Sequence, residues 1–180
     1  MEQKDYYDYY KLLANVHLKR DTDLNNRCIS FILQQSIGNS ILDIACGRGY
    51  LCRQLSQRMP NASVYGIDIA IPDIQYSDLP NLRFIKGDIE NIPFADSFFD
   101  TVICAHTIEH VLDIEKSLSE LRRVTKKRLI IIVPKQREYK YTFDLHVRFF
   151  PYKTSLLKYT KKTGGEIFVL GGDFVYVEDR

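Results

Sequence analysis

Short apolar runs of strand length recur along this 180-residue chain, and polar residues follow each of them. The predicted strands lie at 40–44, 63–69, 82–89, 99–106 and 129–133. Amphipathic stretches, in which apolar residues are spaced three and four apart, lie at 23–36, 50–59 and 114–125. Strands that alternate with helices in this way predict an α/β fold built on a parallel sheet.

The two ends of the chain depart from this alternation. Residues 5–17 predict a helix with a tyrosine-rich face, which suits either a lid over a pocket or a helix packed on the sheet edge. Two final strands at 166–170 and 174–177 predict a hairpin. We expect the whole chain to be one domain, with the lid or helix at 1–22 and the core at 23–180.

Composition agrees with one globular domain and bears on the compartment in which the protein resides. Hydrophobic residues make up 45% and charged residues 27% of the chain, which are ordinary values for globular proteins. We see neither a signal peptide nor an apolar run that could cross a bilayer, so we expect a cytoplasmic protein with no membrane partner. The four cysteines lack paired or zinc-binding spacing, so we predict free thiols and no metal site.

The stretch at 40–51 predicts a strand, a glycine turn and then a helix. Gly47 and Gly49 permit positive φ and a close approach of backbone to a ligand, as in doubly wound folds that hold nucleotide-like cofactors. The spacing Ala45-x-Gly47-x-Gly49, preceded by Asp43, lacks the three glycines of a dinucleotide site. Because a carboxylate would also repel a pyrophosphate, a nicotinamide oxidoreductase is disfavoured. Asp43 instead suits a ligand with an ammonium group or a ribose hydroxyl.

A second acid strengthens this interpretation. Asp68 ends the second predicted strand, close to the ~20-residue offset at which an acid meets ribose hydroxyls in such folds. Together with Asp68, the segment LDIACGRGYL resembles the first motif of class I S-adenosylmethionine-dependent methyltransferases, whose usual form is LDxGxGxG. Ala45 stands where that motif has its first glycine.

The resemblance implies a fold and a cofactor. The family has a Rossmann-like, doubly wound sheet of seven strands in the order 3-2-1-4-5-7-6, in which only strand seven is antiparallel. Its cofactor is S-adenosyl-L-methionine, whose adenine amino group would bind Asp88 and whose adenine ring would pack on Ile89. The cofactor-binding residues implied are Asp43, Ala45, Cys46, Gly47, Gly49, Asp68, Ile69, Asp88, Ile89, Ala105 and His106.

Methyl transfer to a hydroxyl also needs a base, which we expect near the carboxyl ends of the fourth and fifth strands. The catalytic candidates are Glu109, His110 and His146. His110 suits helix capping as well as catalysis, and His106 suits the methionine end of the cofactor. His146 is our preferred base, although a packing or substrate-contact role for it stays open.

The loop at 135–150 is long, aromatic and basic. Its segment YTFDLHVRFFPY resembles a His-x-x-Phe-Phe-Pro region in methyltransferases of bacterial glycan and natural-product pathways. Such side chains suit a sugar-like or natural-product acceptor, with Tyr141, Asp144 and Arg148 as substrate contacts. We therefore predict O-methylation of a small hydroxylated acceptor.

Two other functions stay open. One is a non-catalytic binding subunit that keeps the methyltransferase fold. The other is a nucleic-acid methyltransferase, which the basic C-terminal third would permit but no recognisable binding motif supports. We expect a small-molecule partner rather than a nucleic acid, and a homodimer stays open.

Overall fold

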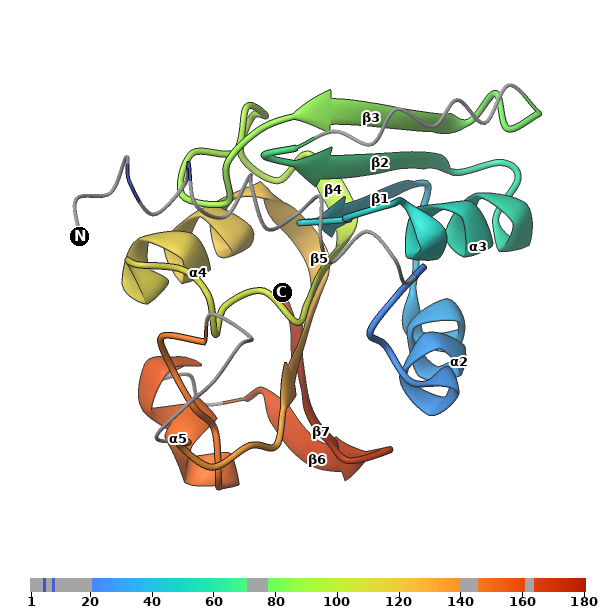
Figure 1. Ribbon diagram of the computed structural model, residues 1–180. Coiled ribbons are helices and arrows are strands. Elements are labelled where there is room, and N and C mark those ends of the chain that lie inside the picture. Colours follow the sequence, from blue (N-terminus) through green and yellow to red (C-terminus); the bar gives the residue numbers. More distant parts are fainter. Residues whose placement is uncertain (1–4, 6–7, 9–20, 71–77, 140–145, 161–163) are drawn as a thin grey trace.

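One sheet organises the molecule (Figure 1). The computed structural model describes residues 5, 8, 21–70, 78–139, 146–160 and 164–180. Within them the strand order is β3-β2-β1-β4-β5-β7-β6, which confirms the predicted order. The predicted helix at 5–17 lies outside the described residues, apart from Asp5 and Asp8, so its role as a lid stays a prediction.

The seven strands follow the apolar runs of the sequence. They are β1 (Ser40–Ile44), β2 (Ser63–Asp68), β3 (Leu82–Lys86), β4 (Phe99–Ala105), β5 (Thr125–Pro134), β6 (Glu166–Leu170) and β7 (Asp173–Asp179). β7 pairs antiparallel with both β5 and β6, whereas the other neighbours are parallel. The predicted hairpin and the single antiparallel strand are therefore confirmed.

Helices cover both faces of the sheet (Figure 1). α2 (Asn26–Gln35) and α3 (Tyr50–Arg58) lie on one face, and α4 (Ile114–Val124) and α5 (Lys153–Thr160) lie on the other. Successive β1 residues point to opposite layers, as strand geometry requires: Ile41 packs with α2 and α3, whereas Leu42 packs in the core that includes α4 and α5. No helix in the described part of the chain has both the length and the apolar content to span a membrane.

β5 is longer than its apolar run predicts. The strand begins at Thr125, directly after α4, and the three residues that follow Thr125 are basic rather than apolar. The Arg128 guanidinium donates to both carboxylate oxygens of Asp179, which lies opposite it on β7, at 2.6 and 2.9 Å. Pairing of Thr125 with β4, and of Arg128 with both β4 and β7, thus extends the strand beyond its hydrophobic segment.

The parallel arrangement fixes where a ligand can bind. The carboxyl ends of β1, β2, β3 and β4 all lie at the same edge of the sheet (Figure 1). In open α/β sheets the ligand-binding crevice lies outside this edge. The residues that follow these strands are therefore the ones from which a site is built.

Candidate active site

The turn between β1 and α3 depends on the positive φ angles of two glycines and on hydrogen bonds to one carboxylate. Gly47 and Gly49 have φ values of 53° and 75°, and a Cβ at Gly49 would lie 2.4 Å from the ring of Phe84. The Asp68 carboxylate at the end of β2 accepts hydrogen bonds from the N–H groups of Gly47 (2.8 Å) and Ala70 (2.9 Å). The turn is therefore tied to the neighbouring strand at the ligand-binding edge.

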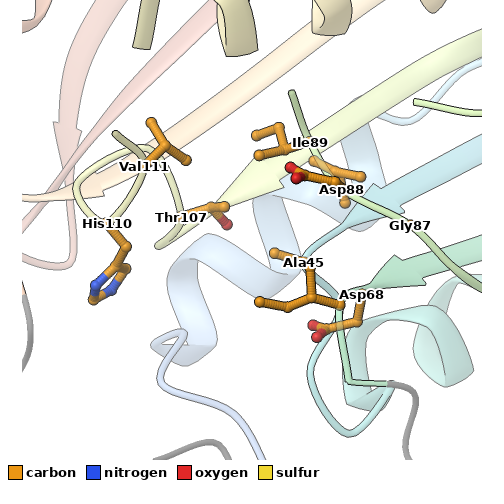
Figure 2. Close-up of a pocket in the computed structure, with 10 residues that line it drawn as sticks. Ala45, Asp68, Gly87, Asp88, Ile89, Thr107, His110 and Val111 are labelled. Atoms are coloured by element: carbon orange, nitrogen blue, oxygen red, sulfur yellow. The ribbon is translucent and has the colours of Figure 1, made fainter. Parts of the chain in front are cut away.

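A pocket opens beside this turn (Figure 2). It contains about 490 Å³ of space free of protein atoms, open solvent included. Its lining is mostly apolar, with two acids and one histidine: Ile44, Ala45, Asp68, Ile69, Gly87, Asp88, Ile89, Thr107, His110 and Val111. Five of these residues are predicted cofactor contacts: Ala45, Asp68, Ile69, Asp88 and Ile89.

Charge is distributed unevenly along the pocket. Figure 2 shows Asp68 and Asp88 toward one end and His110 at the other. Burial raises the pKa of Asp68, although hydrogen bonds from backbone N–H groups, those of Ala70 and Gly47 among them, lower it in part. One carboxylate oxygen of Asp88 accepts from the N–H of Glu90 at 2.8 Å. Each carboxylate has further lone pairs with which it can accept hydrogen bonds from hydroxyl or amino groups of a ligand.

The remaining predicted cofactor residues lie around the pocket rather than in its lining: Asp43, Cys46, Gly47, Gly49, Ala105 and His106. Asp43 is 4% exposed, and its carboxylate accepts from the Cys52 thiol at 3.2 Å. Burial raises the pKa of Asp43 to about 7. The structure therefore gives Asp43 a buried thiol partner that the sequence did not predict, and its contact with a cofactor stays a prediction.

His106 connects the pocket edge to the C-terminal hairpin. Its Nε2 lies 3.3 Å from the Asp173 carboxylate at the start of β7. Burial alone would lower the pKa of His106, but the carboxylates of Asp173 and Glu109 outweigh it and raise the pKa. The sequence did not predict the contact with Asp173, and a place for His106 at the methionine end of the cofactor stays a prediction.

The three predicted catalytic residues meet in one cluster. Glu109, His110 and His146 each offer one side-chain atom, and these atoms all lie within 4.8 Å of one another. The rings of His110 and His146 have centroids 4.7 Å apart at an interplanar angle of 71°. Glu109 is 1% exposed, and burial raises its pKa to about 7 while the charge of His106 opposes the rise. Two imidazoles and a carboxyl group thus adjoin the pocket through His110.

Backbone hydrogen bonds bring His146 to the other two residues. The N–H groups of Val147 and Arg148 both donate to the Glu109 carbonyl, at 2.9 and 3.1 Å. The Arg148 guanidinium donates to the carbonyls of Val111 and, at 2.6 Å, Leu112. Residues 146–148 are therefore fastened along the segment that follows β4.

The structure describes only one of the predicted substrate residues. Arg148 was expected to contact the substrate; its guanidinium donates to the carbonyls of Val111 and Leu112, and its substrate contact stays a prediction. Tyr141 and Asp144 lie outside the described residues, and their substrate contacts stay predictions.

Sequence reasoning missed four pocket residues: Ile44 and Gly87, which adjoin predicted contacts, and Thr107 and Val111, which follow β4. The Thr107 hydroxyl donates to the Ala105 carbonyl at 3.0 Å, so its methyl-bearing carbon is held at the end of β4. Thr107 and Val111 belong to the segment HTIEHV, in which only the two histidines and the acid were predicted site residues. Their position directly after a central parallel strand is the signal that could have identified them.

The chain matches the family described as "Methyltransferase domain" over residues 42–133. It is 32% identical over 116 residues to a demethylmenaquinone methyltransferase of Thermotoga maritima, covering 62% of this chain and 50% of the relative. It is 33% identical over 110 residues to a ubiquinone/menaquinone biosynthesis C-methyltransferase of Stutzerimonas stutzeri, covering 53% and 41%. The chain thus spans about half the length of the curated relatives it matches.

A solved structure has the same fold over nearly the whole chain. It is a SAM dependent methyltransferase from Aquifex aeolicus, with a TM-score of 0.72 and 22% sequence identity. The match covers 94% of this chain and 97% of that one. At this identity the likeness concerns the fold.

Proposed function

This chain belongs to the methyltransferase domain family, and from that membership we propose that it transfers the methyl group of S-adenosylmethionine to a small hydroxylated acceptor. One observation carries the proposal. The Glu109–His110–His146 cluster adjoins one end of a pocket that has Asp68 and Asp88 toward its other end. Groups suited to holding a nucleoside and groups suited to accepting a proton therefore share one site.

The pocket fits the chemistry of the cofactor. Asp68 can accept hydrogen bonds from both ribose hydroxyls, and Asp88 can accept one from the adenine amino group. Ile69 and Ile89 offer apolar surface to the adenine ring. When bound, S-adenosylmethionine supplies an electrophilic methyl group on a sulfonium. Because the methyl group is already reactive, the protein mainly has to position the acceptor oxygen and remove its proton.

His146 is the proposed base. Imidazole accepts a proton near neutral pH, and the neighbouring buried carboxyl group of Glu109, once ionised, stabilises the imidazolium that forms. In this role His146 would accept the proton that the acceptor hydroxyl loses when it is methylated. His110 belongs to the pocket lining and its ring contacts that of His146, so it can orient the acceptor.

A second acceptor chemistry is favoured by the names of the relatives. Those proteins are named as demethylmenaquinone methyltransferases and as a C-methyltransferase of quinone biosynthesis. In a hydroquinone acceptor, loss of a hydroxyl proton would activate the adjacent ring carbon, and the methyl group would then be attached to carbon. The same base serves both reactions, so the position of the new methyl group distinguishes them.

The test is methyl transfer from a methyl-deuterated cofactor to a panel of hydroxylated sugars, phenols and hydroquinones, with the product position read by mass spectrometry and NMR. On the acceptor found, His146→Ala should lower turnover by ~10²–10⁴-fold with cofactor affinity unchanged. Tyr152→Ala, at a side chain 61% exposed in the same part of the chain, should keep wild-type turnover.

Two outcomes would contradict this account. Wild-type turnover of His146→Ala across neutral pH would remove the base assignment. Label found in nucleic acid or protein, with none in small molecules, would remove the small-molecule acceptor.

A further inference from the structure

The cluster of Glu109, His110 and His146 has the composition of a metal-binding site. Its three ligand atoms are one carboxylate oxygen and two imidazole nitrogens, all within 4.8 Å of one another. Glu109 and His110 follow β4, whereas His146 precedes α5. Two separate segments of the chain thus bring three metal-ligating side chains to one point.

An independent observation concerns Glu109. Its side chain is 1% exposed, and neither carboxylate oxygen has a hydrogen-bond partner among the described residues. Burying a polar group without a partner is costly, and burying a carboxylate costs more. A cation at this point would compensate the carboxylate, whereas Arg148, two residues after His146, is engaged with backbone carbonyls.

The backbone holds the ligands in approximate position. Because the N–H groups of Val147 and Arg148 donate to the carbonyl of Glu109, residue 146 is fixed against residue 109 at the level of the main chain. Ligands around a tetrahedral ion with bonds of about 2.1 Å lie about 3.4 Å apart. Side-chain rotations that shorten the longest separation by at most about 1.4 Å would therefore close the site without moving the main chain.

We propose that Glu109, His110 and His146 bind a divalent first-row transition-metal cation beside the cofactor pocket. Two imidazoles favour ions such as Zn²⁺, Co²⁺ and Fe²⁺ over Mg²⁺ and Ca²⁺, which prefer all-oxygen sites. Three protein ligands leave a coordination position open, as in catalytic rather than structural zinc sites.

The consequence for catalysis rests on the proposed function, but the binding of the ion does not. Since His110 also lines the pocket, the open position adjoins it, and an acceptor hydroxyl bound there would be oriented and made more acidic by the ion. His146 would then act as a ligand, and the proton would leave to water.

The experiment measures metal binding without any acceptor. Chelator-treated, full-length protein is titrated with Co²⁺, followed by its visible d–d absorption, and then with Zn²⁺ by competition. One ion per chain is expected. Glu109→Gln and His146→Ala should each weaken binding by more than ~100-fold, beyond the loss caused by removing an outer-sphere partner.

Matched controls separate ligation from folding. Glu115→Gln, an exposed acid in the first turn of α4, and Tyr152→Ala should bind the ion like the wild type. Circular dichroism and thermal melting check that Glu109→Gln is folded; if it is not, His146→Ala, at a side chain less buried than that of Glu109, carries the test. Absence of saturable binding below millimolar Co²⁺, or equal binding by the cluster variants and the controls, would overturn the proposal.

The two proposals can fail separately. Full methyl transfer by chelator-treated enzyme, abolished by His146→Ala, would retain the base and overturn the metal site. Stoichiometric binding of metal with no methyl transfer to any hydroxylated acceptor would retain the metal site and remove the proposed function.

Discussion

The carboxylate of Asp68 accepts a hydrogen bond from the backbone N–H of Gly47 at 2.8 Å. This contact joins the end of β2 to the glycine turn after β1, and both lie at the edge of the cofactor pocket. One acid therefore serves the turn and offers its remaining lone pairs to the pocket. A change at Asp68 would therefore affect both the conformation of the glycine turn and the proposed contact with the cofactor.

The two turn glycines should differ in their tolerance of a side chain. At Gly47, φ is 53° and a Cβ would meet nothing within 4 Å, so Gly47→Ala should cost only the left-handed conformation, about 1–2 kcal/mol. At Gly49, φ is 75° and a Cβ would lie 2.4 Å from the Phe84 ring, so overpacking adds about 1–3 kcal/mol to a similar cost. Chemical denaturation of both variants checks the order, and a Gly47→Ala loss equal to or above that of Gly49→Ala would contradict it.

Asp43 should make stability depend on pH. Its pKa in the folded state is about 7, well above the usual value for aspartate, because the side chain is buried. The folded state then binds more protons than the unfolded state between about pH 4 and pH 7, so this group lowers the free energy of unfolding as pH rises through that range. Asp43→Asn, which cannot ionise, should therefore be more stable relative to wild type at pH 8 than at pH 5, by up to ~2.5 kcal/mol.

Urea unfolding of both proteins at the two pH values measures this difference directly. Other groups with raised pKa values are present in both proteins, so their contributions to the free energy of unfolding cancel when the two proteins are compared. An identical pH dependence for the wild type and Asp43→Asn would show that Asp43 is ionised in the folded state at pH 5.

Adjacent acids on β7 should contribute unequally to stability. Glu178 is 1% exposed and accepts from the Arg122 guanidinium at 3.0 Å and from the Tyr176 hydroxyl at 2.9 Å. Asp179 pairs with Arg128 but its side chain is 65% exposed. Glu178→Gln should cost about 2–3 kcal/mol, whereas Asp179→Asn should cost less than ~1 kcal/mol, because water screens an exposed pair. Denaturation midpoints check this, and equal losses would contradict the argument from burial.

The fold could be predicted because its signals are local. Each strand coincides with an apolar run, and Asp68, Gly47 and Gly49 lie at strand ends or turns where the position in sequence fixes the position in the sheet. Six of the ten pocket residues were therefore named as candidates without coordinates. β5 extends beyond its apolar run because Thr125 pairs with Phe99 of β4 and Arg128 pairs with Asp179 of β7, which are contacts between distant segments.

The candidate catalytic residues show where sequence reasoning ends. Glu109, His110 and His146 were separate candidates, and the spacing of His146 from the other two carries no metal-ligand signature. Their meeting depends on hydrogen bonds from Val147 and Arg148 to the main chain of residue 109. The same contacts engage the guanidinium of Arg148, which charge alone had indicated as a substrate contact. Backbone pairing of this kind leaves no pattern in the sequence.

The most direct measurement of the central claim is calorimetric titration of S-adenosylmethionine into the wild type, Asp68→Ala and Asp78→Ala. Asp68→Ala removes the acceptor proposed for the ribose hydroxyls, each bond being worth about 1.5–3 kcal/mol, so affinity should fall by at least ~10-fold. Asp78 is exposed and precedes β3, at the opposite end of the strands from the pocket, so Asp78→Ala should bind like the wild type. Wild-type affinity in a folded Asp68→Ala protein, or no binding by the wild type, would contradict the account.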